Sequence, residues 1–165
     1  MTIYVGPTNW WWLSSPEAPE ACYYKAFARC CNVSGTTKDG SRLICKSGGV
    51  AWFVAPSCTQ VSSTWNGTTN TLVGNKSCIC DWPTLCSRMI SCGFNINNWF
   101  VPSVFQLQNP GYVCRTNWDT FSAAGYWSST EVSATFAYFV NYFGSAFGSS
   151  KANACCVRAF RCVTY

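Results

Sequence analysis

The last forty residues constrain the fold of this chain more than any other segment does. Two stretches there, Phe136 to Phe143 and Cys155 to Val163, are predicted to be strands, and a segment rich in Gly, Ser and Asn separates them. Because side chains alternate between the two faces of a strand, Arg158 and Arg161 are predicted to lie on opposite faces. Only one of these arginines could then meet Glu131 from a regular strand.

The composition indicates a single domain that meets a partner. The chain has 165 residues, of which 48 % are hydrophobic and 17 % aromatic, so it can bury a substantial core. Only 10 % are charged, whereas a typical soluble domain has roughly 25 %. A surface poor in charge and rich in aromatic residues is typical of a protein in an assembly. The alternative is a compact β domain that uses its aromatic residues as core.

The charge distribution gives no reason to expect nucleic acid as a partner. The net charge is +5, but the basic residues are scattered along the chain and form no run. Scattered charges produce no focused field of the kind that attracts a phosphate backbone.

Thirteen cysteines and no histidine define the chemistry that is open to the chain. This cysteine density approaches that of disulfide scaffolds. The rival is a metal site, but no Cys-x-x-Cys pair is present, and the nearest pattern is Cys78-x-Cys80. We therefore predict disulfides, with buried free thiols and metal as the alternatives, and no metal or other cofactor is expected. The odd count leaves at least one thiol unpaired or bonded to another subunit.

The N-terminal residues suggest where such disulfides would form. The segment that starts at Met1 has no basic region and no long apolar run, so it is not predicted to be a secretory signal. No stretch approaches the roughly 20 apolar residues of a membrane span, and no membrane partner is expected. Release from a lysed host cell would oxidise the cysteines, which predicts a virion location, extracellular after host lysis. A signal removed during processing is the alternative.

The chain is predicted to consist of an N-terminal arm, 1–21, and a folded domain, 22–165. The arm contains Trp10, Trp11 and Trp12, which would be costly to leave in water. We expect these side chains to pack on the domain or on a neighbouring subunit. Within the domain, a pair of strands is predicted at 42–46 and 49–55. A short helix is predicted at 58–65, and two further helices are predicted at 83–92 and 103–108.

Three motifs in the second half of the chain resemble one family. These are Trp99-Phe-Val-Pro-Ser103 with Gln106-Leu107, Tyr126-Trp-Ser-Ser-Thr-Glu131 and Val157-Arg-Ala-Phe-Arg161. Together they resemble the C-type-lectin-fold domains of the Lcl branch, near the formylglycine-generating enzymes, as found in bacteriophage virion proteins. The resemblance covers about residues 49–163. It implies an α+β fold of mostly antiparallel strands with two short helices, and the cysteines of this chain are expected to make that fold disulfide-rich.

The resemblance also implies which residues support the fold. Glu131 is expected to pair with Arg158 or Arg161, and Ser103 is expected to cap a helix. Where the family has an aromatic pair, this chain has Cys155-Cys156, which suggests that disulfides replace aromatic packing. The predicted structural residues are Trp99, Pro102, Trp127, Glu131, Arg158, Arg161, Cys155, Cys156 and Cys162.

Several catalytic and ligand-binding motifs are missing from the sequence. Neither the Glu-Pro-Asn loop nor the Trp-Asn-Asp triplet of a calcium-dependent sugar site is present, and six acids are few for a hard cation. No cysteine stands out as a nucleophile, and no histidine can act as its base. We therefore predict no catalytic residues and a protein that is not an enzyme.

The sequence leads to two main hypotheses about function. The first is a structural protein on the particle surface, a capsid decoration or cement protein, with the major capsid protein or a tail protein and further copies of itself as partners. The second is a tail or fibre module that binds a host surface glycan or receptor through loops. A secreted bacterial lectin is a third. The candidate binding residues are Trp118, Asn141, Tyr142, Phe143 and Phe147. The alternative for the 141–151 segment is a plain hairpin turn.

Overall fold

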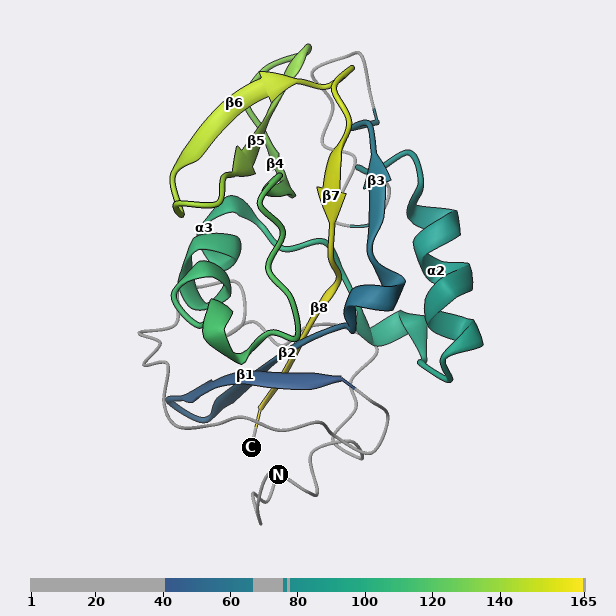
Figure 1. Ribbon diagram of the computed structural model, residues 1–165, viewed down its shortest axis with the longest axis vertical. Helices are drawn as coiled ribbons and strands as arrows, with labels where there is room; N and C mark the ends of the chain where they lie inside the picture. The colour runs from purple at the N-terminus through teal and green to yellow at the C-terminus, as the bar shows by residue number, and fades with distance from the viewer. Residues whose placement is uncertain (1–40, 67–75, 77, 165) are drawn as a thin grey trace.

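The computed structural model describes residues 41–66, 76 and 78–164, which form a mixed α+β domain with two sheets (Figure 1). The predicted arm at 1–21 with Trp10, Trp11 and Trp12, and the domain boundary at 22, lie outside these residues.

The three-stranded sheet has the order β1 (Arg42–Ser47), β2 (Val50–Val54), β8 (Phe160–Thr164). The five-stranded sheet has the order β3 (Val61–Ser63), β7 (Cys155–Val157), β4 (Tyr126–Glu131), β5 (Phe136–Val140), β6 (Ala146–Ser150). Strand pairing is antiparallel except between β4 and β7. The predicted α+β class is confirmed.

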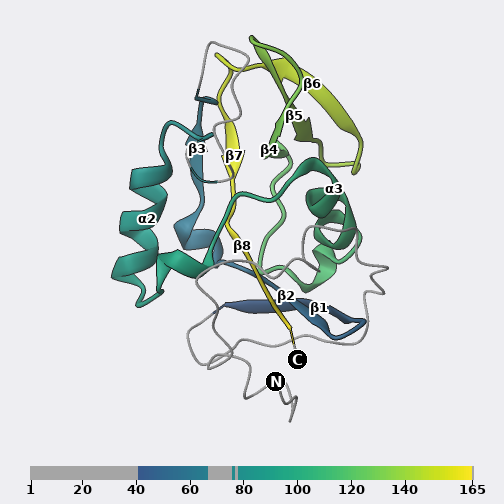
Figure 2. The ribbon, with the colours of Figure 1, turned by 180° about the vertical axis from the view of Figure 1, so that it is seen from behind.

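Helix α2 (Trp82–Ser91) forms where the spacing of apolar residues predicted a helix. Leu85 and Met89, one turn apart, are fully buried. The helix has a proline in its first turn, and Gly93 follows its C-terminal cap with φ of +90°. Figures 1 and 2 show α2 beside β3, on the side of the domain opposite α3.

The second predicted helix begins at the expected cap. Helix α3 (Val104–Gln106) starts after Ser103, whose hydroxyl accepts from the Gln106 amide while the Gln106 side chain accepts from the Ser103 amide. The chain then continues into η5 (Leu107–Tyr112), a helical segment that is kinked at Asn109, whose φ of −148° is not helical. The remaining short 3-10 turns are η3 (Ser57–Thr59), η4 (Ile96–Asn98) and η6 (Arg115–Asn117).

Two sequence predictions of local structure were wrong. The segment 58–65 is not a helix, because only η3 is helical and β3 follows it. The segment between the last two predicted strands is not all loop, because Ala146–Ser150 forms β6 and pairs with β5 along its whole length. The small and polar residues of β6 predict a turn, and only the pairing with β5 makes this segment a strand.

The predicted strand from Cys155 to Val163 is broken in two and belongs to both sheets. Its first part, β7, lies between β3 and β4, and its second part, β8, pairs with β2. At the crossing the carbonyl of Ala159 accepts from Ala55, and Phe160 exchanges two backbone hydrogen bonds with Phe100. These bonds satisfy the backbone where it leaves one sheet for the other.

Strand β2 separates two core clusters, and all five of its residues are buried. Ala51 and Phe53 point into the cluster that contains Trp99 and Trp127. Trp52 points into the other cluster, where its ring meets Phe100 and Phe160 edge to face. The domain is therefore held around a strand that is apolar on both faces.

Candidate functional site

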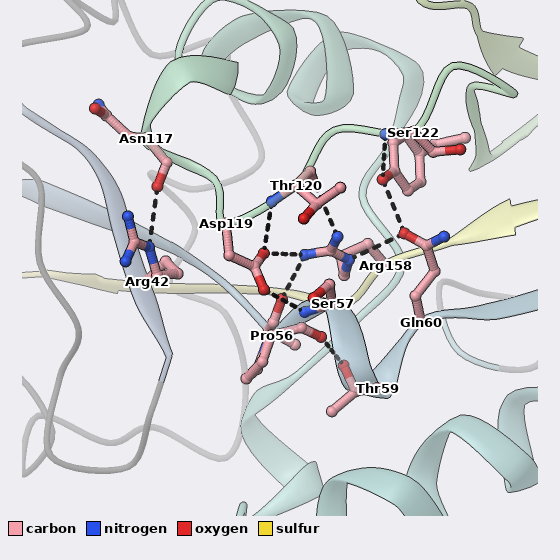
Figure 3. Close-up of polar contacts among 12 residues, drawn as sticks. Arg42, Pro56, Ser57, Thr59, Gln60, Asn117, Asp119, Thr120, Ser122 and Arg158 are labelled. Atoms are coloured by element: carbon pink, nitrogen blue, oxygen red, sulfur yellow. Dashed lines mark hydrogen bonds and ion pairs between the residues drawn. The ribbon is translucent and has the colours of Figure 1, made fainter.

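A cluster of polar contacts surrounds Arg158, at the point where the last strand changes sheet (Figure 3). The Arg158 side chain is fully buried. Its Nη1 donates to Asp119 Oδ1 and to the carbonyl of Ala55, both at 2.9 Å. Its Nη2 donates to the carbonyl of Thr120 at 2.8 Å, and its Nε donates to Gln60 Oε1 at 3.3 Å. Figure 3 shows the guanidinium beside Asp119, Thr120 and Gln60. Because every one of these contacts is made within the domain, the charge of Arg158 stabilises the fold.

Asp119 connects this cluster to the segment after β2. Its Oδ2 accepts from the Ser57 amide at 2.7 Å, and its side chain is 28 % exposed. Partial burial raises the pKa of Asp119, but the hydrogen bonds from Ser57 and the charge of Arg158 outweigh it, so the pKa lies below its usual range. The carboxylate is therefore ionised at neutral pH and is poorly suited to act as a general acid.

The predicted pairing of Glu131 with an arginine is wrong. Glu131 pairs with Lys151, whose Nζ lies 2.5 Å from Oε2, and both side chains are more than nine-tenths buried. Lys151 also donates to the carbonyl of Ala134 and lies over the ring of Trp65. The reason is β6, which the sequence did not predict, because this strand brings Lys151 back to the end of β4.

The two arginines contact different core clusters, which agrees with the predicted opposite faces. Arg158 lies over the ring of Trp118, and Arg161 lies over the rings of Phe53 and Trp99. The predicted structural residues other than Glu131 and the cysteines are all buried, namely Trp99, Pro102, Trp127, Arg158 and Arg161.

The cysteines do not confirm the predicted disulfide-rich framework. Cys114 and Cys162 are disulfide-bonded. Free thiols, by contrast, are present at Cys58, Cys78, Cys80, Cys86, Cys92, Cys155 and Cys156. Burial raises the pKa of Cys78 to about 12 and that of Cys155 to about 11. Such thiols are protonated at neutral pH and are weak nucleophiles.

An uncharged hairpin is the most distinctive surface of the described residues. We call β5, β6 and the turn between them, with Val132, the apolar ribbon; no charged residue occurs between Glu131 and Lys151. Within the described residues β6 pairs with β5 alone, so its other edge is open. Its largest apolar side chains are markedly exposed: Val132 45 %, Phe136 44 %, Tyr142 48 %, Phe143 78 % and Phe147 51 %.

Exposed apolar groups occur on both faces and at the tip of this ribbon. Phe139 pairs with Phe147 across the strands, and their rings lie 6.1 Å apart on one face. Phe136 lies on the opposite face by strand alternation, near Val132. A partner that covers the ribbon would therefore remove several exposed rings from water at once.

The tip of the ribbon is a well-defined turn. Asn141 Oδ1 accepts from the amides of Phe143 and Ser145, and Gly144 has φ of +83°, which favours glycine. These bonds leave Tyr142 and Phe143 on the outside. The predicted binding residues Tyr142, Phe143 and Phe147 are thus exposed, while Asn141 shapes the turn.

Trp118 does not belong to this surface. It is 5 % exposed and packs against Phe121, Tyr126 and Phe160 in the second core cluster. The prediction that it contributes to a binding surface is therefore wrong. Phe136 and Val132, which are exposed, were missed, although the absence of charge between Glu131 and Lys151 would have indicated them.

A cavity of about 420 Å³ lies beside the ribbon. Its lining includes Trp127, Phe139 and Ser149, together with Asn153 and Cys155. This volume is in the range that accepts a small molecule or one large side chain. Because burial keeps the Cys155 thiol protonated, the cavity has no charged group and suits an apolar or uncharged occupant.

Comparisons with other proteins do not assign a family. No model of a known protein family matches the chain, and no curated protein matches it. No helix within the described ranges is long and apolar enough to cross a membrane. In the same ranges no group of three or more acidic or cysteine side chains is arranged to hold a metal ion.

Proposed function

We propose that this protein is a non-enzymatic structural component of a virus particle surface, a capsid decoration or cement protein, and that it attaches to its neighbours through the apolar ribbon. The observation that carries the proposal is an edge hairpin with no charge and several exposed aromatic rings. Natural proteins protect such edges with charges or cover them. Because the edge of the ribbon has no charges to protect it, it needs a partner that covers it. This need supports a role inside an assembly, where another virion protein or a second copy would cover the edge.

The polar residues of the domain support a binding role over catalysis. The buried charges of Arg158 and Lys151 are each bonded to a carboxylate and to at least one backbone carbonyl. The buried thiols of Cys78 and Cys155 have raised pKa values and so are poor nucleophiles. We extend the proposal to the C-type-lectin fold with additional disulfides, which the motifs of the second half of the chain support.

The test is whether the protein is found on purified particles and whether the ribbon holds it there. Lysates of infected cells are separated on a density gradient, and the protein is detected by antibody. It should sediment with the particles, and Phe143→Ser with Phe147→Ser should lower the bound fraction about tenfold, because two large rings no longer leave water. Phe105→Ser is the matched control, since Phe105 is 62 % exposed on α3, outside the ribbon. Protein found only in the host cytoplasm would refute the proposal.

The second function, a tail or fibre module that recognises a host ligand, is favoured by the turn at the ribbon's tip. Its rings are displayed on a backbone that Asn141 fixes, as in a preorganised binding loop. Tyr142→Ser with Phe143→Ser separates the two functions. Particles that keep the protein but adsorb less to host cells would indicate recognition, whereas particles that lose the protein would indicate attachment.

A further inference from the structure

Two thiols that are distant in the sequence lie close together where the segment after β2 meets the end of α2. Cys58 is in η3, and Cys92 is the C-terminal cap of α2. Their Sγ atoms are 4.0 Å apart, and both residues are exposed. Figure 1 shows the short helical turn after β2 beside the lower end of α2. A disulfide requires a sulfur separation of about 2.05 Å, so the atoms must approach by only about 2 Å.

The backbones on both sides of the pair are already held in place. Arg88, in the last turn of α2, donates to the carbonyl of Gln60, directly after η3. The Cys92 amide donates to the carbonyls of Arg88 and Met89, which fixes the end of the helix. Rotation of the two side chains can therefore close most of the gap while the backbone stays in place.

We propose that Cys58 and Cys92 form an oxidation site that closes to a disulfide when the folded protein meets a low-molecular-weight disulfide. One thiolate attacks the reagent, forms a mixed disulfide and releases one reagent thiol. The second thiolate then attacks the sulfur of the first cysteine and releases the other reagent thiol. The two cysteines lose two protons and two electrons in total, and the reagent disulfide is reduced to two thiols.

The bond would join η3 to α2 across 34 residues of sequence. It would also support the Arg158 cluster, because Ser57, the first residue of η3, bonds to Asp119, and Gln60, directly after η3, bonds to Arg158. The inference does not depend on the proposed function, since any change from a reducing to an oxidising compartment would supply the reaction.

The test is disulfide mapping of the full-length protein after incubation with oxidised glutathione at neutral pH. Digestion with trypsin and then chymotrypsin places Cys58 and Cys92 on separate peptides, and cleavage after Phe94 and Trp99 also separates Cys92 from Cys114. The linked Cys58–Cys92 peptides should exceed every other new pair by at least about tenfold, because the folded protein holds these sulfurs at high effective concentration. The same reaction in concentrated urea should lose this preference.

Two variants provide the controls. In Cys92→Ser, Cys58 should accumulate as a mixed disulfide with glutathione, since its partner is missing. Cys80→Ser removes another exposed thiol and should leave the Cys58–Cys92 yield unchanged. The inference is overturned if Cys58 and Cys92 of the folded wild-type protein each carry glutathione. It is also overturned if they form disulfides with other cysteines as often as they form one with each other. This result needs no variant, so a misfolded variant cannot leave the question open.

Discussion

Replacement of Arg158 by methionine should be among the most destabilising single changes in the described part of the chain. The side chain is fully buried, and it donates hydrogen bonds to Asp119, Gln60 and two backbone carbonyls. Methionine fills a similar volume but donates none of these bonds. The carbonyl of Ala55 then loses a buried partner, and Asp119 loses its counter-charge.

The expected loss follows from the exposure of these acceptors. An orphaned buried carbonyl costs about 1–3 kcal/mol, and removal of one member of a buried ion pair costs about 3–5 kcal/mol. Asp119 is 28 % exposed, so water can take over part of its solvation. We therefore expect Arg158→Met to lower the free energy of unfolding by about 3–4 kcal/mol, and Asp119→Asn, which keeps an acceptor oxygen, by only about 1–2 kcal/mol.

The assay is urea unfolding followed by tryptophan fluorescence, for both single variants and the double variant. Because Asp119→Asn removes a charge whose partner is already gone in Arg158→Met, the two losses should not add, and a coupling energy of about 1–2 kcal/mol is expected. Arg115→Met is the matched control, since Arg115 is partly exposed and donates to one carbonyl; it should cost about 1 kcal/mol or less. A loss below about 1 kcal/mol for Arg158→Met, or strict additivity, would refute this reasoning.

Three further predictions concern pH, glycine geometry and the second ion pair. The pKa of Asp119 is lower in the folded protein than in the unfolded chain, so its contribution to stability is full above about pH 4 and is lost as the pH falls through the folded pKa. In this pH range, the free energy of unfolding of Asp119→Asn should therefore depend less on pH than that of the wild type. Gly125→Ala would place a Cβ 2.5 Å from the carbonyl oxygen of Val140 and should cost about 3 kcal/mol or more in urea unfolding, whereas Gly48→Ala, with no atom within 4 Å, should cost about 1–2 kcal/mol for its positive φ alone. Equal costs for the two alanines would contradict the steric argument. Lys151→Met should cost about 3–5 kcal/mol, because Glu131 keeps a buried charge without a partner, and a thermal shift assay that finds no change would contradict the burial of this pair.

The helices could be predicted because their causes are local. Leu85 and Met89 are spaced by one helical turn, and Gly93 follows the helix end. Ser103 followed three residues later by Gln106 is a capping box that can be recognised in the sequence alone. Such interactions are formed between residues at most four positions apart, so the sequence contains all the information they need.

The ion pairs could not be predicted because they depend on contacts between distant segments. Glu131 meets Lys151 only because β6, which is small and polar, pairs with β5. Asp119 meets Arg158 only because the last strand leaves one sheet for the other at this point. In the proposed binding surface, the exposed rings of Tyr142, Phe143 and Phe147 were predicted, but Trp118 was not distinguishable from them by residue type alone.

The passage of the last strand from one sheet to the other has a consequence for how the domain unfolds. Residues 155–164 contribute β7 to one sheet and β8 to the other, so one continuous segment carries pairing in both. The sheets cannot separate as independent subdomains unless this segment detaches from one of them, and detachment would expose the core cluster on that side. The two cores should therefore melt together, as a single cooperative unit with one calorimetric transition.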